Sequence, residues 1–208
     1  MNPGYLSYLL ISVVFILLAS GWKDILLRGV PHVRILLFFV GWFVSGFWTI
    51  PWNGAGISLL IPYLLILGGW GVAVMRKTLL QLHVLLSATL VGMFDFVVLE
   101  LNGWFPFTIS GSPVLDSSLV LSVVIVLLGR KVLWQFTALT IGLLIGEGAH
   151  HVMHWHVMAG HVAGGLDFSD HWWLTMCCTR GLTVVLDTIR QRSAGLVKSW
   201  TFRKNWRD

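Results

Sequence analysis

The sequence has little charge and little cysteine. Only 11% of its 208 residues are charged, whereas 56% are hydrophobic and the mean hydropathy is +0.81. A typical soluble domain is about 25% charged, so we expect lipid to be the solvent for most of this surface. The two cysteines, Cys177 and Cys178, are adjacent and no third cysteine exists, which excludes a disulfide framework.

Common catalytic motifs are also missing. The sequence has no H-E-x-x-H, no G-x-S-x-G and no glycine-rich phosphate loop. This absence disfavours the common zinc peptidases, serine hydrolases and nucleotide-binding enzymes.

The basic residues that are present follow a pattern. All but one of the 14 lysines and arginines lie in four segments, at 23–34, 76–77, 130–131 and 190–207. Cytoplasmic loops of membrane proteins carry such an excess of positive charge. Between and around these segments lie apolar stretches that are candidates for membrane spans. They are residues 5–22, 34–50, 57–75, 78–101, 114–128, 132–145 and 172–189.

Seven crossings place all four basic segments on one side of the membrane. The sequence therefore predicts an all-α, polytopic transmembrane helical bundle in the cell membrane, with the N-terminus outside and the C-terminus cytoplasmic. Residues 1–189 form the bundle. Residues 190–208 form a basic cytoplasmic tail, in which Trp200 and Trp206 interleave with six basic residues. This pattern favours contact with anionic lipids over nucleic acid. The composition also fits a chain that pairs with a companion membrane subunit or with itself.

Three ionisable side chains lie inside the apolar stretches. Counting about 1.5 Å per residue from the predicted outer ends of the spans, Asp95 is about 9 Å deep and Arg180 about 12 Å deep. Buried charges in a membrane normally find a partner. We expect Asp95, Arg180 and Glu147 to form one buried polar cluster in the outer half of the bundle. Its role is either to fix helix packing or to bind a substrate or proton.

Histidines are concentrated after the sixth apolar stretch, with six of the eight between positions 150 and 171. If that helix continues outward, His150, His154 and His161 fall within about 40° of one another and Glu147 about 60° from His150. Carboxylate and imidazole groups at such spacing suit zinc or iron. One interpretation is a divalent metal site at Glu147, His150, His154 and His161, completed by Asp167, Asp170 or His171. The alternatives are haem bound with His83, and a solvated segment that tolerates histidine or senses pH.

Short motifs resemble a family. Phe94-Asp95-Phe96 with Glu100 late in the fourth apolar stretch, and Gly146-Glu147 at the end of the sixth, resemble the YphA-like small polytopic membrane proteins of spore-forming Gram-positive bacteria. The resemblance covers most of the chain and implies a multi-span helical bundle. It implies no assigned activity, so no catalytic residues are carried over.

The sequence favours a non-enzymatic integral membrane protein, either a small transporter-like protein or a component of a membrane assembly. The alternative is a membrane-embedded metal-dependent enzyme using the Glu147, His150 and His154 face. Seven-span zinc hydrolases such as the alkaline ceramidases share the predicted topology. Their last helix carries a His-x-x-x-His pair, whereas here the last span has only His171 at its mouth.

Overall fold

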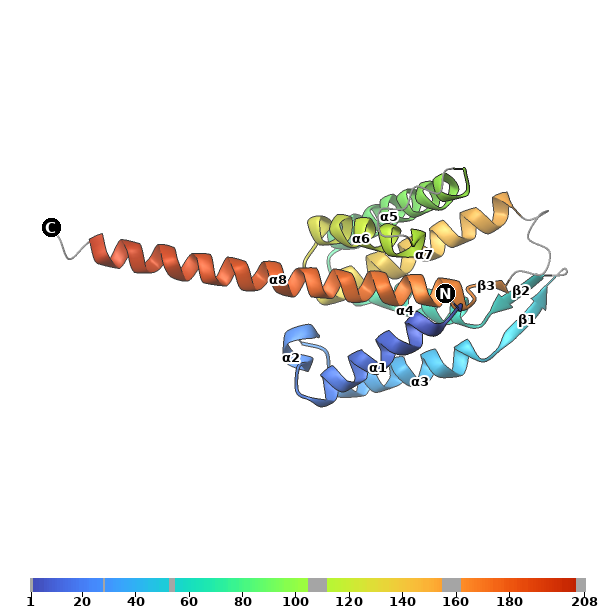
Figure 1. Ribbon diagram of the computed structural model, residues 1–208, viewed down its shortest axis with the longest axis horizontal. Helices are drawn as coiled ribbons and strands as arrows, with labels where there is room; N and C mark the ends of the chain where they lie inside the picture. The colour runs from blue at the N-terminus through green and yellow to red at the C-terminus, as the bar shows by residue number, and fades with distance from the viewer. Residues whose placement is uncertain (1, 28, 53–54, 105–111, 155–161, 205–208) are drawn as a thin grey trace.

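The computed structural model describes residues 2–27, 29–52, 55–104, 112–154 and 162–204, and they form a predominantly helical protein (Figure 1). This confirms the predicted all-α class. The elements in chain order are α1 (Tyr5–Ala19), α2 (Lys23–Leu26), α3 (His32–Gly46), β1 (Thr49–Trp52), β2 (Ala55–Ser58), α4 (Leu60–Val74), α5 (Thr78–Trp104), α6 (Pro113–Leu128), α7 (Val132–Met153), β3 (Val162–Ala163) and α8 (Leu166–Lys204). Each of the seven predicted apolar stretches overlaps one of the longer helices.

The long helices run back and forth along the longest axis of the molecule (Figure 1). One end carries the N-terminus and the three short strands, and we call it the sheet end. The other carries α2 and the turns at 76–77 and 130–131, and we call it the basic end (Figure 1). Two basic residues at this end contact neighbouring helices. Arg130 pairs with Asp187 of α8 at 3.8 Å, and Arg34 of α3 lies 5.1 Å over the Trp70 ring of α4.

The sheet was not predicted from the sequence. Strands β1 and β2 form an antiparallel hairpin with Ile50 opposite Ile57, and β3 pairs parallel to β2. The hairpin occupies part of the stretches that the apolar pattern assigns to the second and third spans. The chain therefore leaves α3 at Gly46 and enters α4 at Leu60, so both helices are 15 residues long.

Small residues allow α5 and α7 to pack closely, as their four-residue spacing indicates. A Cβ on Gly92 would lie 2.6 Å from the Gly142 carbonyl oxygen, and one on Gly146 would lie 2.5 Å from Asp95 Oδ2. Positions 92 and 142, and 95 and 146, therefore face each other. Because the residue numbers rise together, the two helices run parallel, and this register decides which side chains meet at the sheet end.

The first helix is fixed to the last. The Asp170 carboxylate on α8 accepts hydrogen bonds from the backbone N–H groups of Gly4, at 2.8 Å, and of Ser7. These amides open α1, where backbone N–H groups have no partner within the helix. Trp172 and Trp173 then pack against Phe38 and Trp42 of α3, which gives this side an aromatic core.

Both the interior and the surface of the bundle mix polar and apolar side chains. Among the described residues, buried polar side chains are nearly as numerous as buried apolar ones, while many large apolar side chains on the outer helix faces are exposed. Two helices, Thr78–Leu101 and Val132–Met153, have the length and apolar composition to cross a bilayer. Four other apolar helices are shorter.

Candidate metal centre

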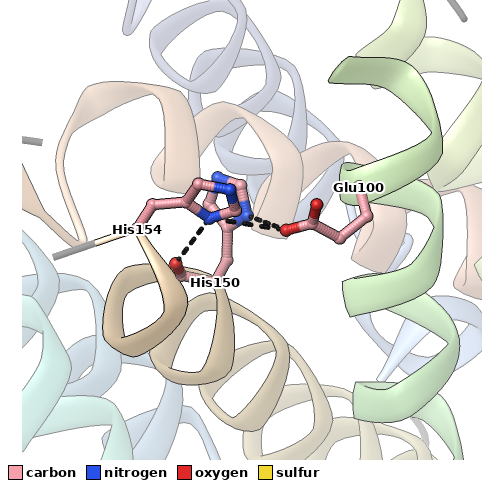
Figure 2. Close-up of side chains that lie close together, drawn as sticks. All are labelled: Glu100, His150 and His154. Carbon is pink, nitrogen blue, oxygen red and sulfur yellow. Dashed lines mark hydrogen bonds and ion pairs between the residues drawn. The ribbon is translucent and has the colours of Figure 1, made fainter. Parts of the chain in front are cut away.

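Three side chains from two helices converge at the sheet end: Glu100 of α5, and His150 and His154 of α7 (Figure 2). Glu100 Oε1 lies 3.3 Å from His150 Nδ1 and 3.4 Å from His154 Nδ1. The two imidazole rings are tilted by 42° relative to each other, with centroids 4.6 Å apart. One carboxylate oxygen is thus shared between two imidazole nitrogens.

The helix geometry explains this convergence. His150 and His154 are four residues apart, so they lie one turn apart on the same face of α7. Glu100 is five residues beyond Asp95, and His150 is four beyond Gly146, which packs on Asp95. The parallel register of α5 and α7 therefore carries Glu100 to the level of His150. His154 follows the last helical residue of α7, and its backbone N–H still bonds to the His150 carbonyl at 3.1 Å.

Both histidine Nδ1 atoms also take part in hydrogen bonds. His150 Nδ1 bonds to Glu100 Oε1, and His154 Nδ1 donates to the His150 backbone carbonyl at 3.1 Å. His154 Nδ1 must therefore give up that proton to bind an ion, whereas the separations from Glu100 Oε1 already fit one. Two ligand atoms bound to one tetrahedral zinc ion at about 2.1 Å each lie roughly 3.4 Å apart. Both separations from Glu100 Oε1 have that length, and the three ligand atoms lie within 4.8 Å of one another. Two histidines and one carboxylate form a known zinc ligand set that leaves a coordination position open.

The centre is accessible from the surface. The side chains of Glu100, His150 and His154 are 20%, 22% and 34% exposed. A hydrated ion can therefore reach the ligands without opening of the bundle.

Glu147 lies outside this centre, contrary to the sequence-based ligand set. Its carboxylate faces His151, with Oε1 3.6 Å from Nδ1, and accepts a hydrogen bond from the Gly164 N–H at 3.4 Å. The reason is helical spacing. Residues four apart differ by about 40° around the axis, whereas residues three apart differ by about 60°, so Glu147 aligns with His151 rather than His150. The fourth predicted ligand, His161, lies outside the described residues.

Glu100, the third candidate ligand, was not among the ligands predicted from the sequence. The sequence places Glu100 near the outer end of the fourth apolar stretch. It does not show that Glu100 meets His150 and His154, because that depends on the register between α5 and α7.

A second cluster lies deeper, between α5, α6 and α8. His171 Nε2 lies 3.7 Å from Asp95 Oδ1 and 3.4 Å from Ser117 Oγ. All three residues are buried. Asp95 Oδ2 lies against Gly146 of α7, the residue before Glu147.

Arg180 does not belong to that cluster, which corrects the predicted pairing with Asp95. Its guanidinium donates to the Leu26 carbonyl at 2.6 and 2.9 Å and to Gln135 Oε1 at 2.7 Å. Gln135 is near the start of α7, at the basic end, whereas Asp95 packs on Gly146. The depth estimate failed because α8 begins at Leu166, six residues before Trp172. Arg180 is therefore about 21 Å from the start of its helix rather than about 12 Å.

The residues considered as completing ligands are engaged elsewhere. Asp170 caps α1, and His171 faces Asp95. Asp167 is exposed in the first turn of α8.

A comparison with protein-family models, curated proteins and solved structures finds no match to this chain. The resemblance to YphA-like proteins stays a prediction.

Proposed function

We propose that the chain is a multi-pass protein of the cell membrane with seven spans, an outer N-terminus and a cytoplasmic C-terminus. The back-and-forth course of the helices and the basic turns at one end support this proposal (Figure 1). So does the combination of exposed apolar side chains on the outer faces and buried polar side chains in the interior. Helices of 15 residues are about 22 Å long, less than the hydrocarbon core of about 30 Å. Local thinning of the bilayer accommodates such short spans.

Reporter fusions test the topology. A reporter active only outside the cytoplasm should work at the N-terminus and fail at the C-terminus, and a cytoplasmic reporter should give the opposite result. Both termini on one side would overturn the seven-span arrangement.

We further propose that the protein is a non-enzymatic, transporter-like component that captures a divalent transition-metal ion, such as zinc, at its outer face. The observation that carries this proposal is the convergence of His150 and His154 on one oxygen of Glu100. In the proposed topology the sheet end is outside, so the centre faces extracytoplasmic solution.

The interior provides a polar face that runs inward from the sheet end. His171, Thr175, Thr179 and Thr183 recur every four residues on α8, and all are buried. The series ends near Gln135, whose amide donates to Thr183 Oγ1 at 2.9 Å. Apolar residues at these four positions would give a core without buried hydroxyl or imidazole groups. Thr175 and Thr183 donate to carbonyls of their own helix at 2.8 and 2.7 Å, whereas among the described residues Thr179 Oγ1 has no hydrogen-bond partner. That unpartnered hydroxyl in the middle of the series supports a transporter-like role.

Elemental analysis of detergent-purified protein tests metal capture. We expect about one zinc ion per chain in the wild type and in Glu147→Gln, and loss of that zinc in Glu100→Gln. Glu147→Gln is a matched control, because it removes a carboxylate at the same end of the bundle that lies outside the centre. Metal-free folded wild-type protein, or loss of zinc in Glu147→Gln with retention in Glu100→Gln, would contradict the assignment.

The alternative function is a membrane-embedded metal-dependent enzyme at the same centre. The observation in its favour is the ligand set, because two histidines and one carboxylate leave room for a metal-bound water. Zinc-dependent hydrolysis of lipid esters or amides by the wild type, absent in Glu100→Gln, would favour the enzyme over the transporter.

We propose anionic lipids as partners of the C-terminal segment. Helix α8 continues to Lys204 without a break at residue 190 and extends beyond the bundle at the basic end (Figure 1). Six basic residues in 190–208 suit the cytoplasmic leaflet. Cosedimentation of a fusion protein carrying residues 190–208 with vesicles should need anionic lipid and weaken with salt.

A further inference from the structure

The Asp95 carboxylate is buried beside a histidine and lacks a normal set of hydrogen bonds. Its side chain is 2% exposed, and among the described residues its Oδ1 atom has no hydrogen-bond partner. His171 Nε2, at 3.7 Å, is too far for a normal hydrogen bond. An unsatisfied carboxylate oxygen in an apolar interior is costly, so the group is more stable when a proton or cation neutralises it.

The neighbouring hydroxyl fixes where the histidine proton lies. Ser117 Oγ donates its only proton to the Val114 carbonyl at 3.1 Å. Towards His171 Nε2, at 3.4 Å, the hydroxyl therefore acts as an acceptor. With the Ser117 hydroxyl as acceptor, Nε2 carries the imidazole hydrogen and donates it to Ser117. The Asp95–His171 pair can hold one further proton, either on the Asp95 carboxylate or on His171 Nδ1. The pair has no net charge when it holds this proton and a charge of minus one when it does not.

We propose that Asp95 and His171 form a proton-binding site inside the bundle, which releases its proton when a divalent ion fills the centre at Glu100, His150 and His154. The inference rests on the proposed metal capture. The titratable groups near Asp95 are His171 from α8 and Glu147 from α7, which follows the Gly146 that packs on Asp95. The uncharged Ser117 from α6 contacts His171. A negative charge at Glu147 disfavours a second negative charge at Asp95.

The distance between Asp95 and Glu100, and the positive charge of a bound ion, support a coupling between ion binding and proton release. Asp95 is five residues from Glu100 on one helix, about 7.5 Å along the axis. Charges that close are weakly screened in a protein interior. A doubly positive ion at Glu100 therefore favours the negative form of the Asp95–His171 pair, and the released proton goes to solution. Metal uptake and proton release would thus be linked, as an exchanger requires.

Counting protons released per zinc ion tests the proposal. Zinc is added to purified protein in weak buffer at a pH where the pair is protonated, and released protons are measured with an indicator dye. We expect Asp95→Asn to release about one proton fewer per zinc than wild type, with unchanged zinc stoichiometry. His171→Gln, a second variant, should reduce the release in the same direction. Asp167→Asn, which removes an exposed carboxylate from α8, should match the wild type.

Infrared difference spectra provide an independent measurement. The wild type should lose a protonated-carboxyl C=O band on adding zinc, and Asp95→Asn should lack that band. If the protein binds zinc and Asp95→Asn releases as many protons as wild type, the inference fails while metal capture stands. If no zinc binds, metal capture and the coupling both fail. In that case a pH titration tests the proton site alone. The wild type should show the protonated-carboxyl band and Asp95→Asn should lack it, and identical spectra of the two proteins would overturn the proton site.

Discussion

The centre at the sheet end and the pair beneath it are built from the same two groups, a carboxylate and imidazole, yet they differ in access to water. The Glu100 side chain is 20% exposed and that of His154 is 34% exposed. The side chains of Asp95 and His171 are 2% and 10% exposed. The first arrangement can exchange an ion with solution. The second is shielded from bulk water and can change charge only by gaining or losing a proton or an ion from within the bundle. The same side-chain chemistry thus has two environments, because the helices place it at two depths, and we propose a different role for each.

Removing the exposed histidines gives the largest expected effect. The His150→Ala/His154→Ala variant should bind zinc at least about 100-fold more weakly than wild type, because loss of a supporting residue alone typically costs about 10–100-fold. His171→Gln should change the affinity by less than about tenfold, since His171 contacts the deeper pair. Competition with a chelating dye measures both affinities. Equal loss in the two variants would show that the two clusters are one site.

Chemical modification sharpens the difference in access. Diethyl pyrocarbonate should modify His150 and His154 at least about tenfold faster than His171, because reaction needs contact with solvent and His171 is buried. Bound zinc should slow the modification of His150 and His154 and leave the rate at His171 unchanged. Peptide mass spectrometry gives the rates, and similar rates for all three histidines would contradict the assigned depths.

Adding one methyl group to α7, by Gly146→Ala, should displace Asp95 of the Asp95–His171 pair and have a smaller effect than the histidine changes. A Cβ on Gly146 would lie 2.5 Å from Asp95 Oδ2, so Gly146→Ala should lower the free energy of unfolding by about 1 kcal/mol as Asp95 shifts. The control is Gly148→Ala on the same helix, where an added Cβ meets no other atom within 4 Å. That change should be neutral or stabilising by up to about 1 kcal/mol.

Thermal unfolding in detergent measures the two glycine variants. Equal stability of Gly146→Ala and Gly148→Ala would show that α5 and α7 do not approach as closely as described. Zinc affinity in Gly146→Ala should stay near the wild-type value, because Glu100 and His150 lie further towards the sheet end.

The helices could be predicted from the sequence because long apolar runs between basic segments specify them locally. Strand β3 could not, since it pairs with β2 across more than a hundred residues of chain. Strands β1 and β2 pair locally, but part of each lies in an apolar run that also suits a membrane span. The α8 start at Leu166 was also hidden, because the apolar run becomes continuous only near Trp172. Because α8 begins earlier than predicted, Arg180 lies far from Asp95 and donates a hydrogen bond to Gln135 instead.

The convergence of His150 and His154, two of the proposed metal ligands, could be predicted from their spacing on one helix. The third ligand could not, because the choice between Glu147 and Glu100 depends on how two helices pack. The glycines at 92, 142 and 146 set that register through backbone contacts. Sequence spacing indicates that the helices approach closely but leaves open which residues of α5 meet which of α7.

X-ray absorption at the zinc edge tests the central claim most directly. We predict two imidazole nitrogens and a carboxylate oxygen around zinc in the wild type, the same shell in Glu147→Gln, and one imidazole fewer in His154→Ala. A wild-type spectrum without imidazole ligands, or a shell that changes in Glu147→Gln and not in His154→Ala, would contradict a metal centre built from Glu100, His150 and His154.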